Sequence, residues 1–165
     1  NLVYVDYPAI IKKSGLNFLP QTVVSNSKPI NNIMKSLGTA AIRTAPSKSG
    51  NITGRVVKGG YYAFDEMITL SNGQVWLKHC DKKLYSMLID GQTLFSNTTT
   101  YSVKFTSNAL NVRSKPSLSG DKMTVLKQGE KVLVFDGYST KQDGYTWVKI
   151  LVGDKVGYVA SKYLK

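Results

Sequence analysis

Short runs of alternating apolar and polar residues, separated by Gly, Asn and Asp, recur along most of the chain. Two clear runs, 67–70 and 75–78, flank Ser71-Asn72-Gly73-Gln74. Alternation with a period of two predicts half-buried β-strands, and Asn-Gly between such runs predicts a hairpin with positive φ at both central residues. Asp143-Gly144 and Gly153-Asp154 lie in the same context. The chain is therefore predicted to be all-β and antiparallel.

Alternation also predicts which side chains face the core, because neighbouring residues on a strand point to opposite faces. After Gly144, one face is expected inside and the other outside. The inward set is Thr146, Val148, Ile150 and Val152, and the outward set is Tyr145, Trp147 and Lys149. In the earlier run, Val75 and Leu77 are expected inward, with Trp76 and Lys78 on the opposite face.

The second part of the chain repeats the first. A shift of 70 positions places Ile42-Arg43 on Val112-Arg113, and a shift of 71 places Trp76 on Trp147. Such a repeat indicates two copies of one unit. We predict a divergent first module over residues 37–97 and a second over 98–165. An irregular arm or linker is predicted over 1–36 (with loop at 21–32), and a short linker over 96–100.

The beginning and the end of the second module have a characteristic sequence. It opens with Leu110-Asn111-Val112-Arg113-Ser114-Lys115-Pro116-Ser117 and closes with Gly157-Tyr158-Val159-Ala160-Ser161-Lys162-Tyr163-Leu164. This text resembles the bacterial SH3 (SH3b) family. The resemblance implies two small SH3-like antiparallel β-barrels in tandem. It also implies a region that targets a peptidoglycan hydrolase, such as a bacteriophage endolysin or an autolysin, to the wall of Gram-positive bacteria.

By the same resemblance, a groove beside the loop that follows the first strand of each module binds wall components. The implied ligand-binding residues are Asn111, Arg113, Tyr138, Tyr145, Trp147 and Tyr158 in the second module, and Arg43, Tyr61, Tyr62 and Trp76 in the first. Two alternatives stay open at this point. Trp147 and Tyr158 could complete the barrel core. Arg43 and Arg113 could brace the loops by donating to carbonyls, which is the interpretation we favour.

The net charge of the chain indicates that polyanions are among its partners. The net charge is +12, and a basic surface concentrates polyanions near it. Peptidoglycan is the expected partner, with teichoic acids as a further candidate, at the outer face of the wall. A surface-anchored adhesin or signalling protein is the alternative, and a single-stranded nucleic-acid binder is a weaker one. No apolar run reaches the roughly 18 residues of a membrane span.

The sequence offers no convincing catalytic group. The single His and single Cys are neighbours, His79-Cys80, and adjacent strand residues cannot form a nucleophile–base pair. Cys80 is expected to be a small buried residue, and His79 to lie at the surface. One His and one Cys are too few for a zinc site. We therefore expect no metal, no cofactor and no catalysis in this chain, which starts at Asn1 like a piece of a longer protein whose catalytic domain lies elsewhere.

Overall fold

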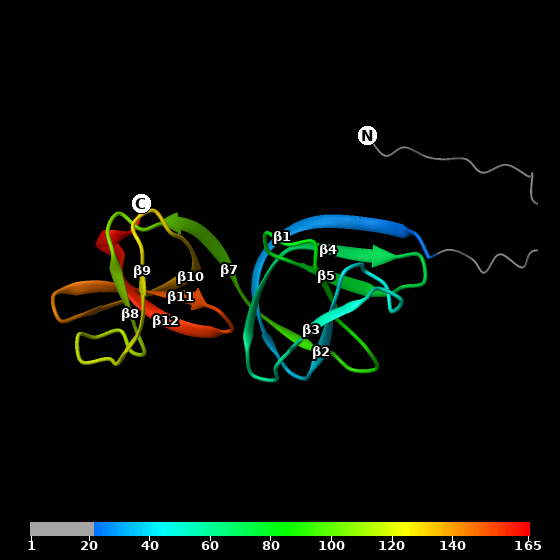
Figure 1. The fold of residues 1–165 in the computed structure, drawn as a ribbon, viewed down its shortest axis with the longest axis horizontal. Helices are drawn as coiled ribbons and strands as arrows, with labels where there is room; N and C mark the ends of the chain where they lie inside the picture. Colours follow the sequence, from blue (N-terminus) through cyan, green and yellow to red (C-terminus); the bar gives the residue numbers. More distant parts are fainter. Residues whose placement is uncertain (1–21) are drawn as a thin grey trace, which may run out of the picture.

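The computed structural model describes residues 22–165, and this part of the chain is β-strand and turn with one short 3-10 helix (Figure 1). No helix in these residues is long and apolar enough to cross a membrane. The strands are β1 (Val24–Ser36), β2 (Ala40–Arg43), β3 (Ile52–Val56), β4 (Tyr61–Leu70), β5 (Val75–His79), β6 (Tyr85–Met87), β7 (Phe95–Phe105), β8 (Leu110–Arg113), β9 (Lys122–Leu126), β10 (Lys131–Gln142), β11 (Tyr145–Val152) and β12 (Lys155–Ala160), and η1 is Ser161–Tyr163. The predicted all-β, antiparallel class is confirmed.

Within residues 22–165 the strands follow one order, β3-β2-β6-β5-β4-β1-β7-β10-β11-β12-β8-β9. We call β1 to β6 with the start of β7 the N-terminal half, and the remainder the C-terminal half. Strand β7 pairs with β1 through its first residues and with β10 through its last. Figure 1 shows the two halves side by side with β7 running from one into the other.

Two predictions about irregular segments were wrong. Residues 24–32 were predicted as loop, yet they belong to β1, which pairs with β4 on one side and, from Asn32, with β7 on the other. Residues 96–100 were predicted as a linker, yet β7 is continuous through them. In both cases polar composition was misread, because an exposed strand needs few apolar residues. Residues 33–36, also part of the predicted irregular arm, are the end of β1, and residues 1–21 lie outside the described residues.

Matching backbone hydrogen bonds occur 70 residues apart in the two halves. Thr44 N donates to Asn51 O at 3.0 Å, and Ser114 N donates to Asp121 O at 2.9 Å. Gly59 N donates to Ser36 O at 2.8 Å, and Gly129 N donates to Thr106 O at 2.8 Å. The spacing of the sequence repeat is therefore also the spacing of these turns.

Each half has its own apolar core. The N-terminal core contains Phe64, Leu77 and Phe95, and the C-terminal core contains Val112 and Ile150 among its buried members. The predicted inward positions on β11 are confirmed for Val148, Ile150 and Val152, which pack in the latter core. Thr146 was predicted inward and is exposed, because it lies at the outer end of the hairpin. On β5, Leu77 and Trp76 pack in different clusters, so the predicted alternation is confirmed there.

The hairpin turns differ in detail. At Asp143-Gly144 both residues have positive φ, 53° and 73°, as predicted. Gly73 has φ 81° whereas Asn72 does not share the left-handed region. The hairpin between β4 and β5 is confirmed, but its predicted turn geometry was wrong. A single glycine suffices there because the loop is longer: Leu70 N donates to Gln74 O at 2.8 Å.

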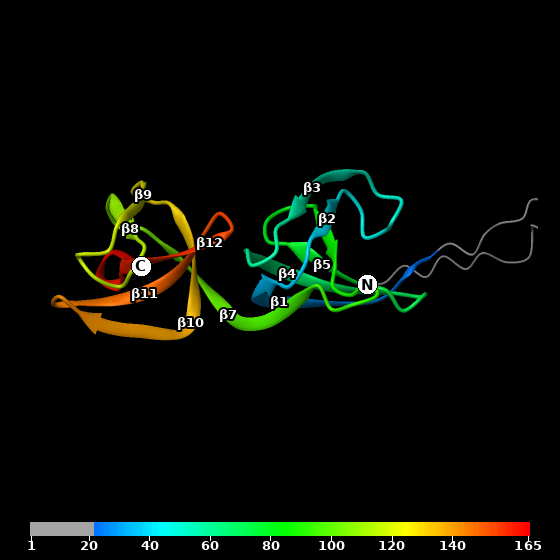
Figure 2. The same ribbon diagram turned by 90° about the horizontal axis from the view of Figure 1, so that it is seen from below.

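The two halves touch through a third apolar cluster and through polar contacts. Ile33 and Ala63 of the N-terminal half pack with Tyr101 and Phe135. Tyr61 N donates to Asp154 O at 2.9 Å. Figure 2 shows the β2–β3 and β8–β9 hairpins on the same side of the molecule, with β1, β7 and β10 running below them.

Candidate functional site

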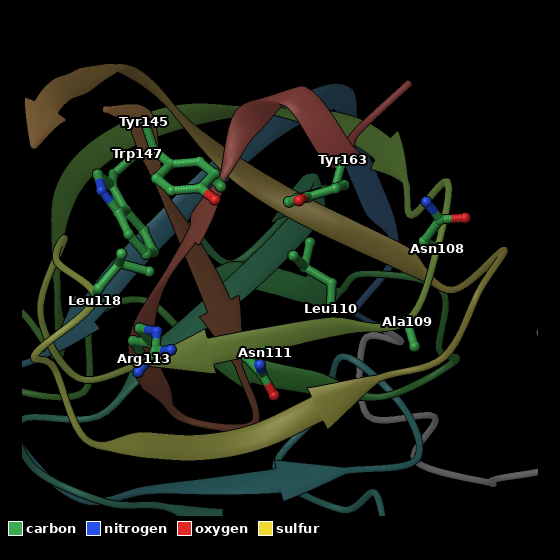
Figure 3. Close-up of a pocket in the computed structure, with 10 residues that line it drawn as sticks. Asn108, Ala109, Leu110, Asn111, Arg113, Leu118, Tyr145, Trp147 and Tyr163 are labelled. Atoms are coloured by element: carbon green, nitrogen blue, oxygen red, sulfur yellow. The ribbon is translucent and has the colours of Figure 1, made fainter. Parts of the chain in front are cut away.

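A pocket of about 310 Å³ lies beside β8 in the C-terminal half, and we call it the C-terminal pocket (Figure 3). Strand β8, the loop after it, the start of β11 and η1 all contribute. Its lining residues are Asn108, Ala109, Leu110, Asn111, Arg113, Leu118, Tyr145, Trp147, Ala160 and Tyr163. Four predicted ligand-binding residues, Asn111, Arg113, Tyr145 and Trp147, therefore meet in one place.

The aromatic wall of this pocket is positioned by the β10–β11 hairpin. Tyr145 and Trp147 lie two residues apart on β11, so both point to the face opposite the core, and their ring centroids are 6.0 Å apart. Trp147 Nε1 donates to Gln142 O at 3.0 Å across the hairpin. Trp147 was predicted to face outward, yet it is only 2% exposed, because it lies at the floor of the pocket beside the ring of Tyr145; Tyr145 is more accessible.

Asp143 ties the loop after β8 to this hairpin. Its Oδ2 accepts hydrogen bonds from Ser117 Oγ and from Leu118 N, both at 2.7 Å. These two bonds lower the pKa of the Asp143 carboxyl below its ordinary value, because they stabilise the charged form. Leu118 is held in the pocket wall although 49% of it is exposed.

Cations line the rim of the pocket. Arg113 Nη1 donates to Gly120 O at 2.9 Å, so the loop-bracing interpretation is confirmed for this residue. Its guanidinium also lines the pocket. Lys162 Nζ lies 4.4 Å from the ring centroid of Tyr145 and 4.9 Å from that of Tyr163. Flat rings beside fixed cations suit a polar ligand that carries carboxylates or peptide carbonyls.

A second pocket, about 440 Å³, occupies the corresponding place in the N-terminal half, and we call it the N-terminal pocket. The correspondence follows from pairing: Arg43 pairs with Tyr85 as Arg113 pairs with Tyr158. Arg43 Nη1 donates to Lys48 O and Gly50 O, both at 2.8 Å, so bracing is confirmed here too. Its lining residues are Thr39, Ala40, Ala41, Arg43, Lys48, Ile52, Arg55, Trp76, Met87, Asp90, Gln92 and Leu94.

The other predicted tyrosines lie elsewhere. Tyr138 and Tyr158 have ring centroids 5.7 Å apart, and burial raises the pKa of Tyr158. Lys149 Nζ lies 5.8 Å from the centroid of Tyr138 and 5.8 Å from that of Tyr61, at the junction of the halves. Tyr62 packs on the N-terminal core, and its hydroxyl accepts Val57 N at 2.8 Å. The structure does not bring these four tyrosines into either pocket described above.

Six of the ten residues that line the C-terminal pocket escaped the sequence reasoning, and so did the neighbouring Lys162. Leu118 and Tyr163 line the C-terminal pocket, and Lys162 stacks on its rings. Tyr163 lies in the SH3b-like segment 157–164, and this position could have identified it as a candidate ligand-binding residue. Leu118 had no such signal, because a single apolar residue in a Ser-rich loop does not show what it covers.

His79 and Cys80 do not form a catalytic pair. His79 was predicted at the surface, but it is 8% exposed, because it shares the inward face of Leu77, and its Nε2 lies 3.0 Å from Ser86 Oγ. Burial lowers the pKa of His79 to about 4. Cys80 is partly buried and its Sγ accepts Tyr101 Oη at 3.2 Å; burial raises its pKa, away from a reactive thiolate. No group of three potential metal ligands occurs within residues 22–165.

Comparisons with known proteins find similarity to a domain family and to a curated protein. Residues 108–165 match the model of the bacterial SH3 domain. The teichoic acids export ATP-binding protein TagH of Bacillus cereus is 30% identical over 66 residues, which are 39% of this chain and 12% of that protein.

Two solved structures, NlpC1 and NlpC2 from Trichomonas vaginalis, are each 12% identical to this chain. NlpC1 covers 87% of this chain with a TM-score of 0.34, and NlpC2 covers 90% with a TM-score of 0.33. The chain spans 49% of each of these two structures, and only 12% of the curated relative.

Proposed function

We propose that this chain is a cell-wall-binding region that targets a peptidoglycan hydrolase, such as an endolysin or autolysin, and carries no catalysis of its own. It would act at the outer face of a Gram-positive wall. The two halves would be tandem SH3b-like modules. One observation carries the proposal: an aromatic pocket with Asn111 and Arg113 beside Tyr145 and Trp147 lies in the segment that matches the bacterial SH3 domain.

The chemistry of the C-terminal pocket favours a peptide of the wall. Tyr145 and Tyr163 offer flat surfaces that lose little side-chain entropy on binding, and Asn111 can both donate and accept hydrogen bonds. Arg113 and Lys162 place positive charge at the rim. A stem or bridge peptide presents amides and a carboxylate to such a surface, which suits this mixture.

A pull-down with purified Gram-positive sacculi tests the proposal. Tyr145→Ala should reduce binding about tenfold or more, since central aromatic contacts dominate binding energies. Tyr138→Ala is the matched control, because it removes a partly buried tyrosine of the same half that lies outside the pocket. Equal losses in both variants, or no retention of the wild type on sacculi, would contradict the proposal.

The same assay separates the alternatives. Sacculi are used before and after chemical removal of teichoic acids, and a single-stranded oligonucleotide gel shift runs in parallel. Binding that survives removal supports the peptidoglycan peptide as ligand. Oligonucleotide binding without sacculus binding supports the nucleic-acid alternative, which the +12 charge keeps open.

A further inference from the structure

The N-terminal pocket has a different chemistry from its C-terminal counterpart. Three cations from three different elements converge on it: Arg43 from β2, Lys48 from the following loop, and Arg55 from β3. One carboxylate, Asp90, also lines it. Trp76 forms part of its wall but is fully buried. The pocket therefore offers net positive charge rather than an accessible aromatic surface.

This charge belongs to the side chains and does not follow from the fold. Arg55 pairs with Ala41 on β2, and at the same place in the C-terminal half Val125 pairs with Asn111. Lys48 likewise stands 70 positions before Leu118. Identical backbone pairing thus carries a cation in one half and an apolar residue in the other. The fold therefore does not require cations at these positions, and their presence in the N-terminal pocket calls for a functional explanation.

The cations are held in ways that leave them available. Arg43 is anchored through Nη1 alone, by its bonds to the carbonyls of Lys48 and Gly50. Lys48 Nζ forms an ion pair with Asp90 at 2.8 Å, and the two side chains are 57% and 53% exposed. An ion pair this exposed contributes little, so a ligand anion can replace Asp90 at small cost.

We propose that the N-terminal pocket binds an oxyanion group, a phosphate or a carboxylate, through Arg55, Lys48 and the guanidinium of Arg43. Guanidinium groups match both anions by paired hydrogen bonds. This inference rests on the proposed function for its source of ligand, since a Gram-positive wall supplies phosphodiesters in teichoic acid and carboxylates in stem peptides. The β2–β3 and β8–β9 hairpins, which each contribute residues to one of the pockets, lie on the same side of the molecule (Figure 2).

Titration of the ¹⁵N-labelled chain with glycerol 3-phosphate, and separately with acetate, tests the site directly. Saturable shifts are expected in the Nε–Hε resonances of Arg43 and Arg55 with at least one of the two probes. Arg55→Gln should weaken the apparent affinity for that probe about tenfold, the effect of one charge-assisted hydrogen bond. Asp90→Asn should strengthen it, because the competing carboxylate is gone.

Lys58→Gln is the matched control. It removes the same charge from the same half at an exposed residue that does not line the N-terminal pocket, and it should leave the affinity unchanged. Equal weakening by Lys58→Gln and Arg55→Gln would overturn the inference in favour of diffuse charge attraction. Shifts with neither probe would also overturn it, while leaving sacculus binding through Tyr145 untouched.

Retention of the Arg55→Gln variant on intact sacculi and on sacculi without teichoic acids identifies the source of the anion. If teichoic acid supplies it, Arg55→Gln weakens retention on intact sacculi only. If stem peptides supply it, the variant weakens retention on stripped sacculi as well. No effect on either material overturns a role of the site in wall binding even where the small anions bind.

Discussion

The two pockets occupy corresponding places in the two halves of the chain, yet their walls differ at nearly every accessible position. Leu118 in one corresponds to Lys48 in the other. Tyr163 corresponds to Leu94, since Ser107 N donates to Tyr163 O as Leu37 N donates to Leu94 O, both at 2.8 Å. The buried Trp and the bracing Arg are kept. The residues that are kept support the backbone of the loop and the floor of the pocket, and the residues that differ lie in the more accessible parts of the walls.

The comparison extends to the way each loop is fixed. In the C-terminal half the Asp143 carboxylate bonds to Ser117 and Leu118. In the N-terminal half Asn72 lies in the corresponding hairpin, and its Oδ1 accepts Gln74 N at 3.0 Å within its own turn. The hairpin thus holds a rigid wall in one half, whereas in the other half the loop is held by Arg43 and by the exposed Lys48–Asp90 pair, with no tie from the hairpin in the described residues.

The largest expected difference between the halves is in their response to acid. His79 fills a core position where the C-terminal half has Ile150: His79 pairs with Phe64 as Ile150 pairs with Val134. Burial lowers the pKa of His79 to about 4, so the unfolded state binds a proton first as pH falls. The stabilisation is complete above pH 6.5 and is lost progressively down to about 4. The loss should be about 3 kcal/mol.

Urea unfolding at pH 7.5, 6 and 4.5 measures this loss. The indole N–H resonances of Trp76 and Trp147 report the two halves separately. His79→Ile supplies the side chain of the other half and should remove the excess acid sensitivity; Ser86 keeps its bond to Ala41 O at 3.1 Å. Parallel pH profiles for the wild type and this variant would show that the buried imidazole does not cause the difference.

A pair of strand glycines should give the next largest difference. A Cβ at Gly157 would lie 2.3 Å from Cγ1 of the fully buried Val112. Gly157→Ala should therefore destabilise the chain by about 1–3 kcal/mol, as overpacking does. At Gly54, opposite Ile42 on the neighbouring strand, the nearest atom is 3.8 Å away.

Gly54→Ala is the control and should leave the free energy of unfolding unchanged or raise it slightly, because alanine loses less backbone entropy. Thermal or urea unfolding measures both variants. A tolerated Gly157→Ala would mean that Val112 can move and that the C-terminal core is looser than its packing indicates.

Much of this comparison was visible in the sequence. The repeat spacing predicted the equivalent positions, and the period of two placed Tyr145 and Trp147 on the face opposite Ile150. Arg43 and Arg113 occupy the same position of the repeat, and bracing was the favoured of two interpretations that the sequence left open; their bonds to loop carbonyls confirm it. These features are local, so spacing along the chain is enough to find them.

What failed depended on contacts between distant strands. The register of β10 against β11 shifts between Val134 and Ser139, and Gly137 has φ 75° in that stretch. Such a bulge redirects the following side chains, which is why Tyr138 lies at the junction of the halves and not in the C-terminal pocket. The strand at 24–32 was missed for a similar reason: its partners, not its composition, make it a strand.

The tie between loop and hairpin should respond to pH in one half only. The pKa of Asp143 is lowered, so its two hydrogen bonds persist above the ordinary carboxyl pKa and are lost as pH falls through the lowered value. Asp143→Asn retains a residue that tolerates positive φ but weakens these bonds. Faster amide exchange is expected at Leu118, with weaker sacculus binding.

Asn72→Ala is the matched change in the other hairpin, and it should leave amide exchange in residues 45–50 as it was. The pH dependence of the Leu118 amide resonance, followed from pH 6 to 2, completes the measurement. If Asp143→Asn changes neither the amide exchange at Leu118 nor sacculus binding, the Asp143 carboxylate does not hold this loop rigid, and the proposed difference between the two loops is wrong.

The smallest effect concerns the Lys48–Asp90 ion pair. Both side chains are more than half exposed, so solvent screens the attraction, and ordering two long side chains opposes it. Asp90→Asn should change the free energy of unfolding by less than about 1 kcal/mol, measured by urea unfolding at low and at high salt. A larger, salt-sensitive loss would mean that the pair fixes the loop as firmly as Asp143 does. The N-terminal pocket would then be closed by its own carboxylate, and its cations would serve structure instead of an incoming anion.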